Sequence, residues 1–299
     1  MSGPLVPAGL EWWRAQPGGA RWLERLPRLV AECAARWELS LGAPFEPATV
    51  SWVAPATLPD GTPAVLKVNF PEAESEHEAA ALGHWRGAGA VRLLAADGER
   101  CAVLVERCQP GTPLWAVGDE EEANAIAASV LRALWAAPPP AGAPFRPLAA
   151  EARRWADELP ARWERHGRPF ARALLETAAG WIGELLASPG PAVVLHQDLH
   201  GGNVLRAARE PWLAIDPKPL AGERELDVAS LLRDRRPELA DDPAPVRRLR
   251  SRLDQLAAEL DLDRERARRW GVIHALAWGV GDDAVLLEIV ACAEWLAEA

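Results

Sequence analysis

The chain changes its hydrophobic periodicity near residue 37 and again near residue 110, and these changes restrict the folds that it can adopt. From residue 37 to residue 106, apolar residues gather in short β-prone segments separated by turn sequences such as LPDGTP and ADGE. The segments are WELSL (37–41), TVSWVA (49–54), AVLKVNF (64–70), VRLLAA (91–96) and CAVLVE (101–106). After QPGTP (109–113) the pattern is mostly helical to the end. A first half built on a sheet and a helical second half are therefore predicted.

Helical patterns fill most of the remaining chain. Residues 10–36 carry Trp, Leu and Val at helical spacing around a Pro-Gly-Gly break, which predicts two short amphipathic helices. The Glu- and Ala-rich residues 71–87 predict a helix that begins after Pro71 and ends near Gly87. Further helices are expected over 119–136, 148–165, 168–187, 225–235, 246–260 and 264–297. Two short apolar runs, 192–196 and 212–216, interrupt this helical half.

The order of these elements predicts an α+β fold with two lobes. Residues 1–107 should form a small lobe with a helical extension, a five-stranded antiparallel sheet and one inserted helix. Residues 108–299 should form a larger, mainly helical lobe, with a hinge near 106–112. A cleft between the lobes is the default position for a ligand.

Composition narrows the class of partner. The chain has 33 basic and 43 acidic residues and a formal charge of −10, so it lacks the basic excess that nucleic-acid binding needs, and a cationic small molecule is favoured. No apolar run reaches the roughly 18 residues of a membrane span, and no signal peptide is evident, so we expect a cytoplasmic protein. The sequence does not indicate an oligomeric state. The four cysteines form no Cys-x-x-Cys pair, which argues against structural zinc or a disulfide framework.

Lysine is nearly absent from the chain. Only Lys67 and Lys218 are lysines, whereas the other 31 basic residues are arginines. Drift in coding bias is the simplest reason for this skew. Arginine does not replace lysine where a compact point charge is needed, so the two surviving lysines are candidates for function.

One polar loop carries the strongest chemical pattern. In HQDLHGGNVL (196–205), Asp198 precedes Asn203 by five residues, and the next apolar run ends in Asp216. Phosphoryl transfer needs a carboxylate that accepts the proton of the attacking hydroxyl, and oxygen ligands that hold Mg²⁺ on the nucleotide phosphates. Asp198 fits the first role, and Asn203 and Asp216 fit the second. The alternative is a polar turn with an Asx cap, in which two glycines only supply the bend.

These residues belong to a longer set of segments through which the chain resembles the kinase-like aminoglycoside phosphotransferases. The similarity is greatest to the branch of streptomycin 6-phosphotransferases and hydroxyurea phosphotransferases, and it covers residues 60 to 232. The supporting segments are AVLKV (64–68), HEAAAL (77–82), GAVRLL (89–94), VLVERCQPGTPL (103–114), HQDLHGGNVL (196–205) and IDPKPLAGERELDVASLL (215–232). The resemblance implies a protein-kinase-like fold and transfer of the ATP γ-phosphoryl group to a hydroxyl of a small polar acceptor, with Mg²⁺ as cofactor.

The resemblance also assigns roles in the first lobe. Lys67 is expected to contact the α- and β-phosphates while Glu78 holds it, and Glu74 and Glu76 are the alternatives if the helix register differs. The backbone carbonyl of Glu106 and the amide of Cys108 are expected to bind the adenine edge. Because residues 41–54 contain a single glycine, we assign no phosphate contact to that loop.

In the second lobe, Lys218 lies inside the IDPKP motif. It could approach the γ-phosphate or the acceptor, or it could be a surface lysine in a proline-bounded turn. His196 and His200 could relay protons, although structural hydrogen bonds to the backbone are favoured. Asp227 is expected to brace the catalytic loop from the start of a helix.

The acceptor is expected to lie between the catalytic loop and the C-terminal helices. Trp270, His274 and Trp278 repeat every four residues there, a pattern more typical of core packing than of a ligand wall. Asp282 and Asp283 follow, and we hypothesise that one of them meets a guanidinium or ammonium group of the acceptor.

Three functions are compatible with these patterns. The first is an antibiotic kinase that phosphorylates streptomycin-like aminoglycosides, and the second is a hydroxyurea-type or metabolic kinase with another acceptor. The third is a catalytically silent binding protein of the same fold. Lys67, Asp198, Asn203 and Asp216 are all present, which argues against the third, because silent relatives usually lack one of these groups.

Overall fold

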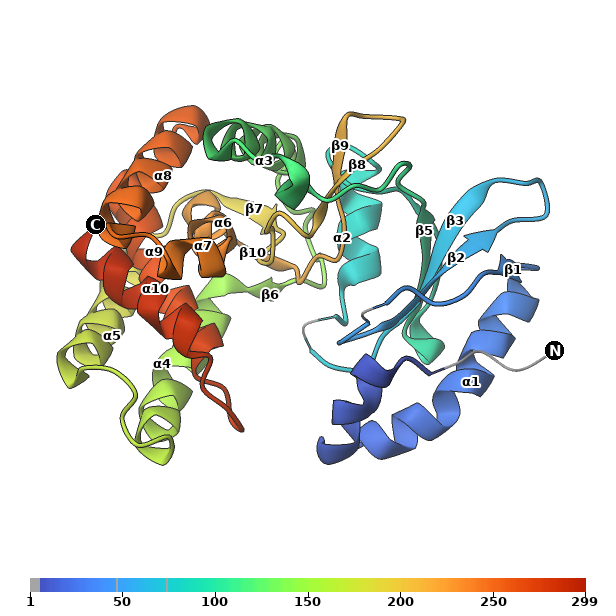
Figure 1. Ribbon diagram of the computed structural model, residues 1–299, viewed down its shortest axis with the longest axis horizontal. Coiled ribbons are helices and arrows are strands. Elements are labelled where there is room, and N and C mark those ends of the chain that lie inside the picture. Colours follow the sequence, from blue (N-terminus) through green and yellow to red (C-terminus); the bar gives the residue numbers. More distant parts are fainter. Residues whose placement is uncertain (1–5, 47, 74) are drawn as a thin grey trace. The chain divides into compact units, whose positions relative to one another are not determined.

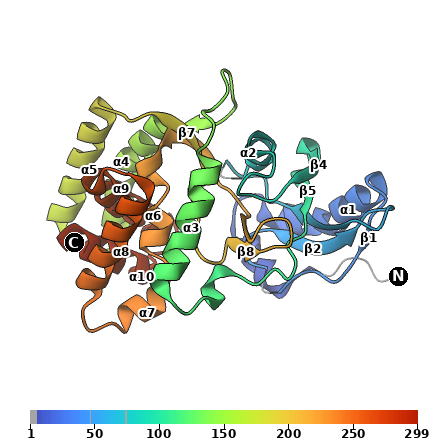
Figure 2. The ribbon, with the colours of Figure 1, turned by 90° about the horizontal axis from the view of Figure 1, so that it is seen from above.

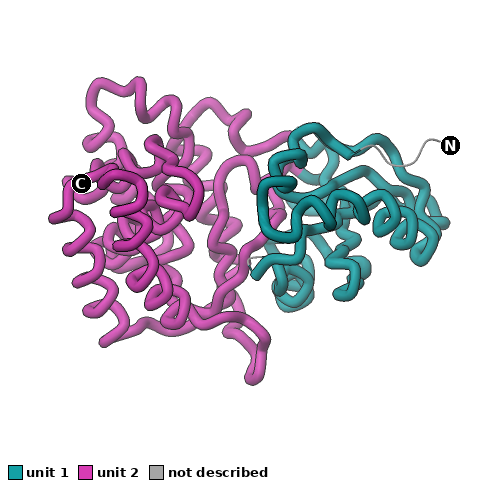
Figure 3. The backbone as a smooth tube through the Cα atoms, turned by 90° about the horizontal axis from the view of Figure 1, so that it is seen from below, with its two compact units in different colours: residues 1–111, 207–211 teal, residues 112–206, 212–299 magenta. Residues whose placement is uncertain are grey.

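A computed structural model describes residues 6–46, 48–73 and 75–299 of the chain (Figure 1). The chain forms two compact units, coloured separately in Figure 3. Unit 1 comprises residues 1–111 and 207–211, and unit 2 comprises residues 112–206 and 212–299. The first unit thus ends at Gly111 rather than at 107, and it includes a short segment, 207–211, that the sequence did not predict.

Unit 1 is built on an antiparallel five-stranded sheet with the order β1-β2-β3-β5-β4, as predicted. The strands are β1 (Ser40–Leu41), β2 (Trp52–Thr57), β3 (Pro63–Val68), β4 (Leu93–Asp97) and β5 (Ala102–Glu106). A 3₁₀ turn, η2 (Gly98–Arg100), joins the last two. Strand β1 is shorter than expected, because the backbone amide of Leu39 donates to Ala34 and completes the turn after the preceding helix.

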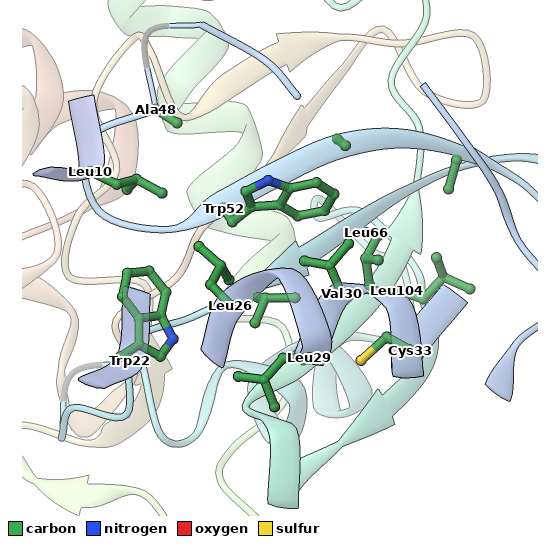
Figure 4. Close-up of a cluster of buried hydrophobic side chains, with 14 of the residues drawn as sticks. Leu10, Trp22, Leu26, Leu29, Val30, Cys33, Ala48, Trp52, Leu66 and Leu104 are labelled. Atoms are coloured by element: carbon green, nitrogen blue, oxygen red, sulfur yellow. The ribbon is translucent and has the colours of Figure 1, made fainter. Parts of the chain in front are cut away.

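The helical extension covers one face of this sheet. It contains the 3₁₀ helix η1 (Ala8–Ala15) and the α-helix α1 (Gly19–Arg36), which are separated at Gly18, where φ is 81°. The apolar side of α1 packs against side chains that share one face of the sheet (Figure 4). Among the buried residues of this core are Leu26, Val30, Trp52, Leu66 and Leu104.

Helix α2 (Glu78–Trp85) begins later than the sequence predicted. The hydroxyl of Ser75 donates to the carbonyl oxygens of Phe70 and Glu72, and these bonds stabilise a turn where a helix after Pro71 was expected. The end of the helix is as predicted, because Arg86 and Gly87 adopt positive φ.

Unit 2 is mainly helical (Figure 2). Its buried central helix α9 (Arg264–Gly279) contacts α5, α6, α8 and α10. The other helices are α3 (Glu120–Leu134), α4 (Leu148–Arg165), α5 (Arg172–Ala187), α6 (Ala229–Leu232), α7 (Arg236–Ala240), α8 (Pro245–Leu260) and α10 (Leu287–Glu298), with 3₁₀ turns η3 (Leu114–Ala116) and η4 (Arg224–Leu226). Within the described ranges, no helix is both long and apolar enough to cross a membrane.

Two small sheets support the polar loop of unit 2. Strands β6 (Arg146–Pro147), β10 (Leu220–Glu223) and β7 (Ala192–Leu195) form one sheet, and β8 (Val204–Arg206) and β9 (Trp212–Ala214) form an antiparallel hairpin. The two apolar runs that correspond to β7 and β9 were predicted, but β6, β8 and β10 were not. Strand β10 has the sequence LAGE, whose β-propensity is low, and it forms by pairing with β7.

The single helix expected over 264–297 is wrong. The chain leaves α9 at Gly279 and turns back on itself, since the amide of Leu286 donates to the Gly279 carbonyl and Val280 pairs with Val285. Glycines at 279 and 281 lower helix propensity at this point.

Candidate active site

In unit 1, Lys67 projects from β3 and forms a buried ion pair with Glu78 of α2. Its Nζ lies 2.9 Å from both carboxylate oxygens, and the side chains of Lys67 and Glu78 are 9% and 3% exposed. The predicted pairing with Glu78 is confirmed. Glu76 is 64% exposed and lies near His77, whereas Glu74 lies outside the described residues.

Two polar side chains that sequence reasoning missed complete this cluster. Asn69, two residues beyond Lys67, donates from Nδ2 to Glu78 Oε2 at 2.8 Å. Ser51 donates to Asn69 Oδ1 at 2.6 Å. The i, i+2 spacing of Lys67 and Asn69 is the signal that could have identified Asn69, because alternate strand residues share a face. The carboxylate of Glu78 is therefore fixed from two sides.

Glu106 ends β5 at the expected hinge. Its carboxylate accepts hydrogen bonds from Arg209 and from the backbone amide of Arg92, at 2.9 to 3.1 Å. Burial favours the neutral acid, but these donors and their charges together hold the pKa of Glu106 below its ordinary value. Cys108 is buried, and burial raises the pKa of its thiol to about 12. Its thiol therefore stays neutral and is unsuited to nucleophilic chemistry.

In unit 2, a buried aspartate fixes the start of the catalytic loop, residues 196–203. The carboxylate of Asp227 accepts from the backbone amides of His196 and Gln197, at 3.0 and 2.6 Å, and from Trp135 Nε1 at 2.8 Å. Burial raises the pKa of Asp227 to about 6, while the three donors favour the ionised form. The contact expected between Asp227 and the loop is present.

The β8–β9 hairpin brings Asn203 and Asp216 together. Val204 pairs with Ala214, and the amide of Ile215 donates to the Asn203 carbonyl at 2.9 Å, so Asn203 and Asp216 flank the same end of the hairpin. The side-chain nitrogen of Asn203 donates to the backbone carbonyl of Asp198 at 2.9 Å. This bond leaves the amide oxygen Oδ1 as the atom of Asn203 that is suited to a cation.

Asp198 lies between two cations. Its side chain is 14% exposed, Lys218 Nζ lies 4.0 Å from Oδ2, and Arg233 Nη2 lies 3.9 Å from Oδ1. Burial raises the pKa of Asp198, and Lys218, His200 and Arg233 oppose that rise. Lys218 reaches this position because its backbone amide donates to the His196 carbonyl at 3.0 Å. Sequence reasoning missed Arg233, which lies beyond the motif in sequence.

Both loop histidines make structural hydrogen bonds. His196 Nε2 lies 2.9 Å from the carbonyl oxygen of Ile215, so the neutral ring carries its proton on Nε2. Burial lowers the pKa of His196 to about 4, and the ring is therefore neutral near pH 7. His200 Nδ1 accepts from the Gly202 amide at 3.0 Å, and its ring stacks on Trp115 with centroids 5.3 Å apart.

Asp234, which sequence reasoning also missed, anchors the middle of the loop. Its Oδ2 accepts from the amide of Gly201 at 2.7 Å, and its Oδ1 accepts from Trp115 Nε1 at 2.8 Å. The indole of Trp115 covers Gly201 and Gly202, where an added Cβ would lie 2.5 to 2.6 Å from its ring atoms. The two glycines therefore allow close approach of the indole as well as the bend in the chain.

Asp282, one of the two hypothesised acceptor contacts, pairs with two arginines of α4. Arg162 donates to both of its oxygens, at 3.1 and 2.8 Å, and Arg165 lies 3.1 Å from Oδ1. These arginines also lower the pKa of Asp282. The carboxylate is thus already compensated by α4, which sequence reasoning could not anticipate because 117 residues or more separate these partners. In the helical stripe, Trp270 and His274 are buried, whereas Trp278 is partly exposed.

Comparison with known proteins identifies the family. The family model for aminoglycoside/hydroxyurea antibiotic resistance kinases matches residues 36–286. The chain belongs to this family. Family members are phosphotransferases, so the chain is a kinase that acts on a small molecule.

Individual relatives in the kinase family match almost the whole chain. A streptomycin 6-kinase of Streptomyces griseus is 37% identical over 98% of this chain and 97% of the relative. A hydroxyurea phosphotransferase of Kitasatospora aureofaciens is also 37% identical, over 94% of this chain and 82% of the relative. These similarities confirm the branch that the sequence motifs indicated.

Solved structures show that this resistance kinase has the kinase-like fold. A ternary complex of the aminoglycoside phosphotransferase APH(4)-Ia with AMP-PNP and hygromycin B has a TM-score of 0.62 at 17% identity and covers 92% of this chain and 97% of the solved one. The choline kinase LicA of Streptococcus pneumoniae has a TM-score of 0.63 at 11% identity and covers 92% and 100%. The fold predicted from the sequence is confirmed.

Proposed function

We propose that this kinase transfers the γ-phosphoryl group of ATP to a hydroxyl of streptomycin and thereby inactivates the antibiotic. The observation that carries the proposal is the near-full-length similarity to a streptomycin 6-kinase at 37% identity. A second streptomycin 6-kinase, from Streptomyces glaucescens, has the same identity over 90% of this chain. The formal charge of −10 also favours a cationic acceptor. Because the reaction consumes ATP, we propose the cytoplasm as its location.

Asp198 is the proposed catalytic base. Its carboxylate orients the acceptor hydroxyl and takes its proton as the hydroxyl oxygen attacks the γ-phosphorus. The bond from the γ-phosphorus to the bridging oxygen then breaks, and ADP leaves. Lys218 is close enough to Asp198 to meet the transferred group or the acceptor, and we propose the transferred group because its ammonium is a compact positive charge.

Nucleotide binding is proposed for groups of unit 1. Lys67 contacts the α- and β-phosphates through Nζ, and Glu78 holds the ammonium in one position. The carbonyl of Glu106 and the amide of Cys108 bind the adenine edge. The hydrogen bonds that Arg209 and the Arg92 amide make to Glu106 support this role, because they fix the end of β5. Most of the rate enhancement then comes from positioning and charge neutralisation.

The residues at the hairpin end fit a Mg²⁺ ion that arrives with the nucleotide. Asn203 offers its amide oxygen and Asp216 its carboxylate, which is the oxygen chemistry that Mg²⁺ prefers. In the described residues, no cluster of three or more His, Cys, Asp or Glu side chains could hold a metal, and one carboxylate plus phosphate oxygens is a common Mg²⁺ arrangement. When bound, the ion neutralises charge on the phosphates.

The remaining predicted site residues support this arrangement. His196, His200 and Asp227 hold the catalytic loop through the hydrogen bonds described above. Asp282 and Asp283 are the proposed contacts for a cationic group of the acceptor, and Asp282 also pairs with two arginines of α4.

A hydroxyurea-type kinase is the second candidate, because a hydroxyurea phosphotransferase is equally similar at 37% identity. ATP consumption measured against streptomycin, other aminoglycosides, hydroxyurea and simple amino alcohols separates the two. We expect kcat/KM to be highest for streptomycin. Turnover of hydroxyurea or amino alcohols without turnover of any aminoglycoside would replace the first proposal by the second.

A further inference from the structure

Two cations lie beside the proposed base, one at each carboxylate oxygen. Lys218 Nζ is 4.0 Å from Asp198 Oδ2, and Arg233 Nη2 is 3.9 Å from Oδ1. Both distances exceed those of hydrogen bonds, so the cations act on Asp198 through charge. Neither cation occupies a lone pair of the carboxylate, and both oxygens can still accept a hydrogen bond from a substrate hydroxyl.

Arg233 and Lys218 both lie over the indole ring of Trp278. The Cζ of Arg233 lies 4.9 Å from the ring centroid of Trp278, and Nζ of Lys218 lies 5.5 Å from it. Three separate parts of the chain meet here, because Trp278 belongs to α9, Arg233 follows α6, and Lys218 follows β9. Cation–π attraction of this kind orients a charged group as well as stabilising it.

Arg233 is held in place from further directions. It is 3% exposed, and its Nη1 donates to Nδ1 of His274 at 2.5 Å. The backbone around it is fixed by Arg252, which donates to the carbonyls of Leu231, Leu232 and Asp234 at 2.9 to 3.1 Å. Burial lowers the pKa of Arg233 to about 10, so it remains a cation near pH 7.

Arg233 also has a single carboxylate partner among the described residues, the proposed base Asp198. Within the described part of the chain, Asp198 is the one carboxylate within 4.0 Å of this buried guanidinium. A buried cation placed only for packing is costly, whereas a buried cation beside a catalytic carboxylate offsets the cost of burying that carboxylate. The position of Arg233 beside Asp198 therefore favours a role for Arg233 in the reaction.

We propose that Arg233 and Trp278 are positioning residues for the reaction: Trp278 aligns Arg233 and Lys218 on the two oxygens of Asp198, and this alignment holds the carboxylate in the orientation in which it meets the acceptor hydroxyl. The inference rests on the proposed function, because it takes Asp198 as the base. It assigns roles to two residues that no motif of the sequence marked as functional.

The test compares two tryptophans that hold cations in the same way. Trp181 of α5 has the guanidinium carbons of Arg268 and Arg269 at 5.0 and 5.6 Å from its ring centroid, and both arginines pair with Glu265 and not with Asp198. Trp181→Leu is therefore a matched control for Trp278→Leu. Both variants should lose some thermal stability. Only Trp278→Leu should lower kcat, by about tenfold, with the KM for ATP within about twofold of the wild type. Equal kcat values for the two variants would overturn the proposal.

Further substitutions at Arg233 and Trp278 test separately whether the charge and the aromatic ring matter for kcat. Arg233→Lys keeps a cation and should retain more of kcat than Arg233→Met, which keeps the length of the side chain but removes its charge. Trp278→Phe keeps an aromatic face and should retain more of kcat than Trp278→Leu. If Arg233→Met fails to fold, Arg233→Gln, which also removes the charge, is compared with Arg233→Lys in its place. An uncharged Arg233 variant whose kcat equals that of Arg233→Lys would contradict the proposal.

The outcome can be separated from a failure of the proposed function by comparing the wild type with Asp198→Asn. If the wild type turns over no aminoglycoside, the proposed function is wrong. If the wild type does and Asp198→Asn retains that turnover, Asp198 is not the base, and this inference is wrong while the proposed function stands. If Asp198→Asn is inactive while the Trp278 and Arg233 variants keep the wild-type kcat, only this inference is wrong. Combined Trp278→Leu and Arg233→Met should lower kcat by less than the product of the single effects, because both act on the same carboxylate.

Discussion

The buried pair of Lys67 and Glu78 offers a prediction in which stability and activity separate. Lys67→Met leaves the Glu78 carboxylate buried without the ammonium that it pairs with, while its hydrogen bond from Asn69 at 2.8 Å is retained. Removing one partner of a buried ion pair typically costs about 3–5 kcal/mol, and the retained Asn69 bond places the expected loss at about 3 kcal/mol. The loss of the phosphate contact should also lower kcat/KM by at least about a hundredfold.

The double variant Lys67→Met/Glu78→Gln then distinguishes the two effects. A glutamine removes the uncompensated charge and can still accept from Asn69, so about half of the lost free energy of unfolding should return. Activity should not return, because no ammonium reaches the phosphates. Urea unfolding measures the first quantity, and a coupled ATP assay with streptomycin measures the second.

Lys67→Arg is the conservative partner of this experiment. It keeps the charge, but its planar guanidinium cannot replace a compact ammonium 2.9 Å from both oxygens of Glu78. It should therefore lose most phosphotransfer activity in a folded protein. If activity instead recovered together with stability in the double variant, or if Lys67→Arg kept wild-type turnover, Lys67 would be a structural residue and the reasoning would be refuted.

Three further predictions concern the catalytic loop. Burial lowers the pKa of His196 to about 4 in the folded state, whereas the unfolded value is about 6.5, so the unfolded state takes up a proton first as the pH falls. The free energy of unfolding should therefore fall by about 3 kcal/mol because of this residue between pH 6.5 and pH 4. His196→Gln should reduce this dependence on pH in urea unfolding. Asp227→Asn replaces an acceptor oxygen by a donor among three donors, one of them Trp135, and should cost about 2–4 kcal/mol in urea unfolding, whereas wild-type stability would show the brace to be dispensable. Gly202→Ala places a methyl 2.6 Å from the Trp115 ring and should lower kcat. The control Gly183→Ala, with no atom within 4 Å of its added Cβ, should leave kcat unchanged. Equal kcat values for the two variants would show that the contact between Trp115 and the loop does not matter for the reaction.

Much of the fold was predictable because local patterns and tertiary structure agree. The β-prone segments of unit 1 form the expected sheet, and most helical periods of unit 2 form the expected helices, except over 225–235 and 264–297, where the helix is interrupted. The scarcity of lysine also directed attention to Lys67, whose predicted pairing with Glu78 is present. Strand β10 was missed because it exists through its pairing with β7, which no local propensity encodes.

The sequence located the catalytic loop, but it did not predict several of the residues that surround this loop. The HQDLHGGNVL motif identified the loop, but the groups that surround it come from distant parts of the chain. Arg233 and Asp234 reach the loop from the end of α6, and Trp278 joins them from α9. Asp282 shows the converse, because a carboxylate that looks available in the sequence is paired with arginines of α4. Such pairings depend on which helices pack together, and a single sequence does not specify this.

The most direct test of the proposed chemistry is the rate at which Asp198→Ala phosphorylates streptomycin, measured beside its affinity for AMP-PNP. The variant removes the proposed base and leaves Lys67 and the adenine contacts in place. We predict that phosphoryl transfer is abolished while the affinity for AMP-PNP stays within about threefold of the wild type. Retained turnover of streptomycin by Asp198→Ala would contradict the account.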